Sequence, residues 1–470
     1  MKEAKTGFER RTALLDEALG VGRSFDIVGR TLTIGGRRAK LWVVNGYAQD
    51  AMLERIIASW RLLPSLEDVP DLQVFLERWV TACDASVQMD WDKAVTAVFS
   101  GKTLLVLDGY HGGILLEAKQ FPLRSVEEPD TSKVLRGSHD GFGESLMKNA
   151  ALLRRRIRTP QLTLERLEAG ERSKTDIALC YMAGQADEKL VNELRQKISA
   201  IDVRSVAMSQ ESIAEAIAPR QWYNPFPKVR YTERPDVATA CLMEGDVLVM
   251  VDNTPAVMIL PTTFFRFAEE INDYYFPPLV GTYLQLVRIT ILLLTVFITP
   301  LWYLLVKDPG RLHENLHFLL IQDDYYVPLI VQLLLVELIV DLLKLASLNT
   351  PSALSSSFSM LGALILGDFA VQSRWLVPEV LVYMAFVAIA NYAQHSYEMG
   401  YAFKLCRMAL LILIWLADWW GFGFGVAGIL LLVATTKPLA GKGYLYPLIP
   451  FNGKDMKALL HRRPISRKNT

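Results

Sequence analysis

Long apolar runs fill the chain from about Gly281 to Thr436, after roughly 280 residues with the composition of an ordinary soluble protein. One run, Ile289 to Val306, holds 18 residues without a charge, enough to cross the ~30 Å hydrocarbon layer of a bilayer once its flanks are counted. We therefore expect an α/β soluble N-terminal half of two similar subdomains, followed by an α-helical polytopic membrane domain. Whole-chain values hide this division, because a net charge of zero and a mean hydropathy of +0.22 average the two halves.

Four membrane spans are predicted, at about 284–306, 326–345, 353–371 and 376–395. The apolar run that follows, Met408 to Thr436, has 29 residues and would be about 43 Å long as one helix, which exceeds the membrane. Asp418, Trp419, Trp420 and three glycines in the middle of this run suit a break. We therefore expect a hairpin or a re-entrant pair there.

Both ends of the chain indicate the topology. Residues 1–20 are charged and contain no apolar stretch of the kind found in a secretory signal, which favours a cytoplasmic soluble half. The tail 437–470 carries eight bases against one acid, and the positive-inside tendency places it in the cytoplasm as well. We expect no nucleic-acid partner, because the tail lacks a folded basic surface or an aromatic platform.

The soluble half has the pattern of one α/β unit that occurs twice. Each copy is predicted to hold a strand, a helix and a later hairpin: 40–44, 48–63 and 101–117 in the first, and 177–182, 187–200 and 245–260 in the second. The predicted division is an extension (1–30), a first subdomain (31–125), a helical connector (126–171), a second subdomain (172–280), the membrane domain (281–436) and the basic tail (437–470).

The connector carries four arginines within five positions: Arg154, Arg155, Arg156 and Arg158. Such a group is ordinarily a solvated helix face. The functional alternative is a contact with membrane phosphates or with a neighbouring subunit, and the sequence leaves both interpretations open.

Two short motifs indicate chemistry that their surroundings do not support. His313–His317 matches the HExxH zinc motif, but it lies in a polar loop between apolar runs and has no third ligand at a usual spacing. Ser100–Thr103 resembles the end of a P-loop, but it lacks the first glycine and precedes a predicted strand, not a helix. The four cysteines are widely scattered. We therefore expect neither an enzyme nor a metal or cofactor site.

The second span holds two acids, Glu337 and Asp341, four positions apart and hence on one helical face. A charge in mid-membrane costs about 2.5–3.5 kcal/mol on insertion scales, so both should face protein or water. One interpretation is a helix-end acid that pairs with Lys344 or Arg288. The other is a ring that attracts cations in an oligomer.

The third span carries a stripe of small and hydroxyl-bearing residues at spacings of three and four: Ser352, Ser355, Ser356, Ser359, Ala363 and Gly367. Such a stripe can be a close helix–helix packing face. It can equally line a narrow wet pore, where hydroxyls replace part of an ion's hydration. Asp368 would then lie at the pore mouth.

Several segments resemble the A subunits of the spore germinant receptors, the GerA family. They are 141–160, with Gly-Phe-Gly-Glu-Ser-Leu and the arginine group, 172–175, 226–236 and 251–255. Two more segments, 349–355 and 444–454, are most similar to one branch of this family. The similarity extends from about residue 35 to 455.

This resemblance implies a multi-pass protein of the spore inner membrane, with its N-terminal domains and C-terminal tail on the cytoplasmic, spore-core side. It implies a homo-oligomer that passes monovalent cations during germination, together with other germination proteins of that membrane. The serine stripe is then favoured as pore lining. The alternative is a non-conducting membrane scaffold for other germination proteins.

Overall fold

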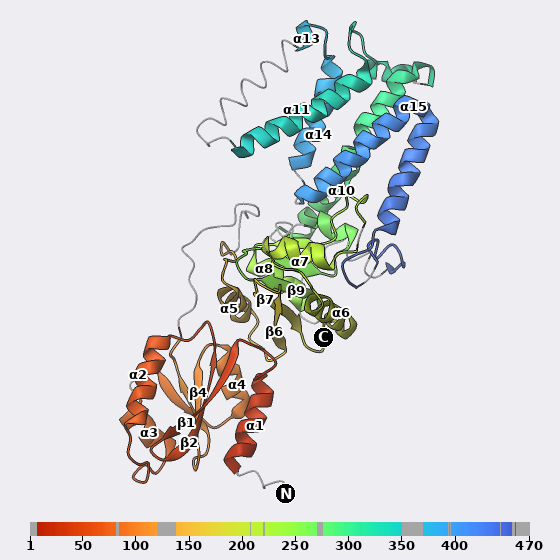
Figure 1. Ribbon diagram of the computed structural model, residues 1–470. Coiled ribbons are helices and arrows are strands. Elements are labelled where there is room, and N and C mark those ends of the chain that lie inside the picture. The colour runs from red at the N-terminus through yellow and green to blue at the C-terminus, as the bar shows by residue number, and fades with distance from the viewer. Residues whose placement is uncertain are drawn as a thin grey trace. The chain divides into compact units, whose positions relative to one another are not determined.

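The computed structural model of the chain describes residues 7–80, 84–119, 138–206, 208–219, 221–269, 276–311, 313–349, 370–392, 394, 396–441, 443–453 and 456 (Figure 1). It divides into two compact units. The first consists of Met1–Pro219, Val229–Thr262 and Pro438–Gly441, and the second of Arg220–Lys228, Thr263–Lys437 and Lys442–Thr470. The segment 350–369 lies outside the described residues, and with it the whole serine stripe and Asp368.

The first subdomain is a five-stranded antiparallel sheet with helices on both faces (Figure 1). Its strands follow the order β1-β2-β4-β5-β3 and comprise β1 Ile27–Ile34, β2 Arg37–Val44, β3 Ala85–Gln88, β4 Thr103–Leu107 and β5 Gly113–Leu116. Its helices are α1 Gly7–Leu19, α2 Asp50–Arg61, α3 Leu72–Trp79 and α4 Trp91–Phe99. The central strand β4 is buried throughout: Leu105 packs with α2 and α3, while Leu104 packs with α1 and α4.

The predicted N-terminal extension belongs to this subdomain. In α1, Phe8, Leu15 and Leu19 are buried against the sheet, and β1 pairs with β2 over its full length. Charged residues stand between the apolar ones, and they make the segment look like a polar tail in the sequence. One of them, Asp16, accepts hydrogen bonds from Lys40 and Trp42 of β2.

The second subdomain repeats the sheet order, as β6-β7-β9-β10-β8. Its strands are β6 Leu162–Ala169, β7 Thr175–Met182, β8 Arg230–Thr232, β9 Val247–Val251 and β10 Val257–Leu260, and its helices are α5 Leu146–Arg156, α6 Glu188–Ser199, α7 Ser209–Ile217 and α8 Pro235–Met243. The duplication predicted from the sequence is therefore present as two antiparallel sheets of equal topology. The connector is shorter than predicted, because β6 falls within 126–171 and pairs with all of β7.

The second unit is helical. Its elements are η1 Phe264–Ala268, α10 Pro278–Lys307, η2 Pro309–Arg311, η3 Glu314–Leu319, α11 Leu329–Asn349, α13 Ala370–Gln372, α14 Pro378–Tyr392 and α15 Tyr397–Thr435. Within the described ranges, α10 and α15 are long and apolar enough to cross a bilayer, judged by length and composition.

Helix α15 is a helical hairpin. Its backbone leaves the helical region at Ala417 and Asp418, where the φ of Asp418 is +48°. This break falls in the part of the apolar run where one was predicted. The limbs on either side, 397–416 and 419–435, run back along each other (Figure 1), and a Cβ on Gly421 would overlap the Leu413 carbonyl oxygen. Glycine thus permits the close approach of the two limbs.

Several helix ends meet at one end of this unit, which we call the tip end. The Lys307 ammonium at the close of α10 donates to the carbonyl oxygens of Ile414 and Trp415, at 3.2 and 3.3 Å, and pairs with Asp418. The Tyr326 amide before α11 donates to the Arg374 carbonyl before α14, at 3.1 Å. At the opposite end, which we call the root end, lie both termini of the α15 hairpin.

Candidate functional site, a buried charge cluster

Four charged side chains meet among the apolar helices of the second unit, and we call them the charge cluster: Glu337, Asp341, Lys404 and Arg407. Glu337 and Asp341 lie on one face of α11, four residues apart, and Lys404 and Arg407 lie on one face of the first α15 limb, three apart. Each helix therefore presents a pair of like charges to the opposite pair on its neighbour.

Glu337 is the centre of the charge cluster and is only 2% exposed. Its Oε1 accepts from Arg407 Nε at 2.6 Å and from Arg407 Nη2 at 2.5 Å. Its Oε2 lies 3.3 Å from Lys404 Nζ, and the same ammonium donates to the Glu337 carbonyl oxygen at 2.9 Å. Lys404 Nζ also lies 2.5 Å from Asp341 Oδ2. The four charges sum to zero, as burial away from water requires.

A third helix, α10, and a small cavity adjoin the charge cluster. Arg407 Nη1 donates to the Thr295 carbonyl oxygen of α10 at 2.7 Å. Beside the ion pairs is a cavity of about 10 Å³, room for one water molecule. Asp341 Oδ1 and Asn391 Oδ1 are buried without a hydrogen-bond partner in the described part of the chain, and both residues line this cavity. A water there would donate to these two oxygens.

Glu337 and Asp341 both lie against charged side chains of α15. The partners found there, Lys404 and Arg407, are not the Lys344 or Arg288 that one interpretation of the sequence named. Lys404 and Arg407 precede Met408, where the apolar run was taken to begin, and were therefore not considered with the spans. The signal that identifies them is the helix start at Tyr397, which places both bases inside the α15 hairpin.

Arg154 joins the first subdomain to the second. Its five N–H groups all donate: Nε and Nη2 to Asp26 at 2.8 and 3.1 Å, Nη2 also to Ser24 Oγ at 3.1 Å, and Nη1 to the carbonyl oxygens of Thr159 and Leu162 at 3.1 and 3.0 Å. Both side chains of the Arg154–Asp26 pair are fully buried. Arg154 is therefore inaccessible to a membrane surface or a neighbouring subunit, which corrects that interpretation for this residue.

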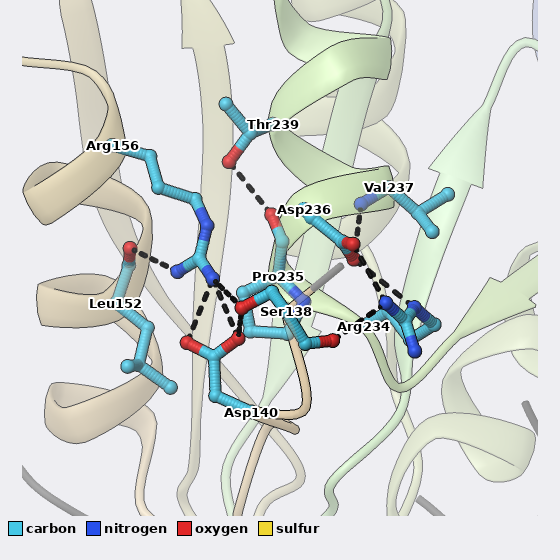
Figure 2. A network of polar contacts seen from close by, with 9 residues as sticks. All are labelled: Ser138, Asp140, Leu152, Arg156, Arg234, Pro235, Asp236, Val237 and Thr239. Atoms are coloured by element: carbon cyan, nitrogen blue, oxygen red, sulfur yellow. Dashed lines mark hydrogen bonds and ion pairs between the residues drawn. The ribbon is translucent and has the colours of Figure 1, made fainter. Parts of the chain in front are cut away.

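The Arg156 side chain also forms its hydrogen bonds and ion pair within the chain (Figure 2). Its Nη2 donates to both carboxylate oxygens of Asp140, at 2.6 and 2.7 Å, and to Ser138 Oγ at 2.9 Å. The Ser138 carbonyl oxygen accepts in turn from Arg234 Nη2 at 2.8 Å, and Arg234 forms a bidentate pair with Asp236. The network joins the two sequence segments 141–160 and 226–236, since α5 packs against α8 here.

The remaining connector arginines, Arg155 and Arg158, are exposed. Arg158 Nε donates to the Arg155 carbonyl oxygen at 3.2 Å. These two residues keep the surface position that both sequence interpretations require, and a membrane or subunit contact by them remains a prediction.

The two short motifs of the sequence lie in a loop and in a turn. His313 caps the short 3₁₀ helix η3, where its ring Nδ1 accepts from the Asn315 amide at 3.4 Å. Within the described ranges, no group of three His, Cys, Asp or Glu side chains could hold a metal ion. Gly101 forms a turn with a φ of +97° and is followed by β4, so no helix N-terminus is available to a phosphate.

Comparison with known proteins identifies the family. The model of the Bacillus/Clostridium GerA spore germination protein matches residues 14–470. The chain belongs to the GerA family. The resemblance inferred from its motifs is thereby confirmed over nearly the whole length.

Individual GerA relatives are similar over most of the chain. Stage V sporulation protein AF of Bacillus subtilis is 36% identical over 466 residues, which cover 98% of this chain and 94% of that protein. Spore germination protein KA of the same organism is 28% identical, with 94% of this chain and 82% of that protein covered. The solved N-terminal domain of the A subunit of the Bacillus megaterium germinant receptor GerK3 is 29% identical, covers 55% of this chain and 95% of that domain, and gives a TM-score of 0.43.

Proposed function

We propose that this GerA-family protein is a multi-pass protein of the spore inner membrane whose copies assemble into a channel that releases monovalent cations during germination. The observation that carries the proposal is the stripe of small and hydroxyl-bearing residues that follows α11 in the sequence, because hydroxyl groups at helical spacing can line a narrow wet pore. Membership of a family of spore germination proteins supplies the biological setting.

Within this channel, the charge cluster positions the pore helix and does not itself bind the permeating ion. Glu337 is neutralised by Arg407 and Lys404, so its negative charge is not available to a passing cation. The cluster fastens α11 to the α15 hairpin and to α10. The serine stripe follows α11 directly in sequence and lines the pore in this proposal, with Asp368 at its mouth.

The contacts of the helical unit support one topology. If α10 crosses from the spore core outward, the tip end lies outside, where Lys307 meets the break of the α15 hairpin. The second limb of the hairpin then returns the chain to the core side. The root end, the N-terminal domains and the basic tail lie on that side, as the positive-inside tendency requires.

Conductance in planar bilayers tests the proposal with purified full-length protein. We expect cation-selective current, and we expect Ser359→Trp to abolish it by filling the pore. Ser373→Trp, at an exposed turn between α13 and α14, is the matched control and should conduct normally. A silent wild type that still captures other germination proteins would instead favour the non-conducting scaffold. Normal current through Ser359→Trp would refute the assignment of the pore.

A further inference from the structure

A short turn at the root end presents two aromatic side chains away from the protein. The Asn224 amide donates to the Gln221 carbonyl oxygen at 3.1 Å and closes the turn, with Trp222 and Tyr223 at its central positions. Trp222 is 96% exposed and Tyr223 is 55% exposed. Their rings meet edge to face with centroids 6.2 Å apart. Glycine, proline, asparagine and aspartate dominate such positions, so turn geometry does not account for an aromatic pair here.

The turn is fastened to the end of the α15 hairpin by side chains on either side of the aromatic pair. Gln221 Nε2 donates to the Thr435 carbonyl oxygen at 3.1 Å, and Gln221 Oε1 accepts from the Lys437 amide at 3.2 Å. Asn224 Nδ2 donates to Thr436 Oγ1 at 2.7 Å. These hydrogen bonds hold the turn beside the last residues of the second limb, so its position along the axis of the hairpin is fixed.

A third aromatic residue secures the turn from the inside. Phe226 is buried, and its ring meets Phe403 of the first limb edge to face at 6.0 Å. In the next residue, the Pro227 carbonyl oxygen accepts from the Tyr444 hydroxyl at 2.9 Å. One segment thus places one aromatic side chain in the core and projects two outward, so the exposure of Trp222 and Tyr223 does not result from a loose chain.

The exposed residues of the second limb indicate which environment surrounds Trp222 and Tyr223. It carries exposed apolar side chains, including Leu430 and Leu431, up to Thr435, and exposed Lys437 follows two residues later. Such a change from leucine to lysine marks the boundary between hydrocarbon and headgroups. Trp and Tyr prefer this level, because each ring is apolar with one polar atom that binds water or headgroups.

We propose that the turn 221–224 is an interfacial anchor, with Trp222 and Tyr223 inserted among the phospholipid headgroups on the root side of the membrane. The proposal rests on the membrane location of the helical unit under the proposed function. The partner is the bilayer itself: the aromatic rings meet the upper acyl chains, and the Lys437 ammonium meets lipid phosphates. The anchor fixes the depth of the α15 hairpin at its root end.

Tryptophan fluorescence of full-length protein in nanodiscs tests this anchor. The nanodiscs contain phosphatidylglycerol and phosphatidylethanolamine, with a quenching label either near the headgroup or deep in the acyl chain. The difference between wild type and Trp222→Phe isolates the signal of Trp222. We expect shallow labels to quench this signal at least twofold more than deep labels, and aqueous acrylamide to quench it weakly.

Two further variants separate failure of the anchor from failure of the membrane assignment. Trp79→Phe removes a partly exposed tryptophan of α3 in the first subdomain, whose signal should respond to acrylamide and not to either lipid label. Trp420→Phe removes an exposed tryptophan of the second limb, whose signal should respond to a lipid label. If only Trp420 responds to lipid, the anchor is refuted and the membrane location stands; the turn then lies in water or against another protein. If Trp420 does not respond either, the membrane location itself is refuted.

Discussion

Neutralising Glu337 tests whether the charge cluster holds the helical unit together. Glu337→Gln keeps the shape of the side chain and one acceptor oxygen, but it removes the charge that Arg407 contacts at 2.5 and 2.6 Å and Lys404 at 3.3 Å. The sum of the four cluster charges then changes from zero to +1. Removal of one partner from a buried ion pair leaves the other charge uncompensated and costs about 3–5 kcal/mol. We expect a loss of this size in the free energy of unfolding.

A second substitution distinguishes electrostatics from packing. Arg407→Gln alone gives a sum of −1 and should destabilise the protein to a similar degree. The double variant Glu337→Gln/Arg407→Gln restores neutrality through the remaining Lys404–Asp341 pair. We therefore expect the double variant to lose clearly less than the sum of the two single losses, with a coupling of at least ~1.5 kcal/mol.

The assay is denaturant unfolding of purified protein in detergent micelles or nanodiscs, followed by circular dichroism. Asp324→Asn is the matched control, because it removes the acid of an exposed pair with Arg374 at 4.0 Å in the same unit. Such surface pairs contribute about 0–1 kcal/mol. Strict additivity of the two single losses, or a Glu337→Gln protein as stable as the control, would refute the electrostatic reasoning.

Three further predictions concern other parts of the chain. Arg154→Met leaves the buried Asp26 carboxylate without its guanidinium and should cost about 3–5 kcal/mol in the unfolding of the N-terminal half; a loss below ~1 kcal/mol in urea titrations of the full chain would contradict it. Gly425→Leu places side-chain atoms on Leu410 and should destabilise the α15 hairpin by ~1–3 kcal/mol in thermal unfolding, whereas Gly428→Leu, where a Cβ meets nothing within 4 Å, should be neutral. Burial raises the pKa of Asp140, but hydrogen bonds, chiefly from Arg156, outweigh it, and the pKa is lowered from the ordinary value of 3.8. The stability gained from the charged Asp140 is thus fully present above about pH 5 and is lost as pH falls through the lowered pKa, so the advantage of wild type over Asp140→Asn should vanish only in acid.

Local periodicity was sufficient to predict the central strands of both sheets and one helix in each subdomain, α2 and α6. The apolar stretches of β2, β9 and β10 and the amphipathic helix α6 all lie where the sequence placed them. Strand β6 was missed because three of its eight residues, Glu165, Arg166 and Glu168, are charged and resemble a polar connector. Its strand character comes from its eight-residue pairing with β7, which is a tertiary property.

The candidate site was only half predictable, because its partners are far apart in the chain. The cost of a buried charge shows from the sequence alone that Glu337 needs a partner. The identity of that partner depends on the packing of α11 against α15, and Arg407 lies 70 residues away. In the same way, Asp26 is 128 residues from Arg154, so four arginines within five positions gave no sign that one of them is buried.

The Arg154 guanidinium, whose five N–H groups all donate hydrogen bonds, links the two sheets of the N-terminal half. A hinge motion between the two sheets must break the hydrogen bonds from Arg154 to Ser24 and Asp26, in a place that water does not reach to replace them. Relative movement of the two sheets is therefore costly at this joint, and a larger movement is easier in segments that lie beyond it.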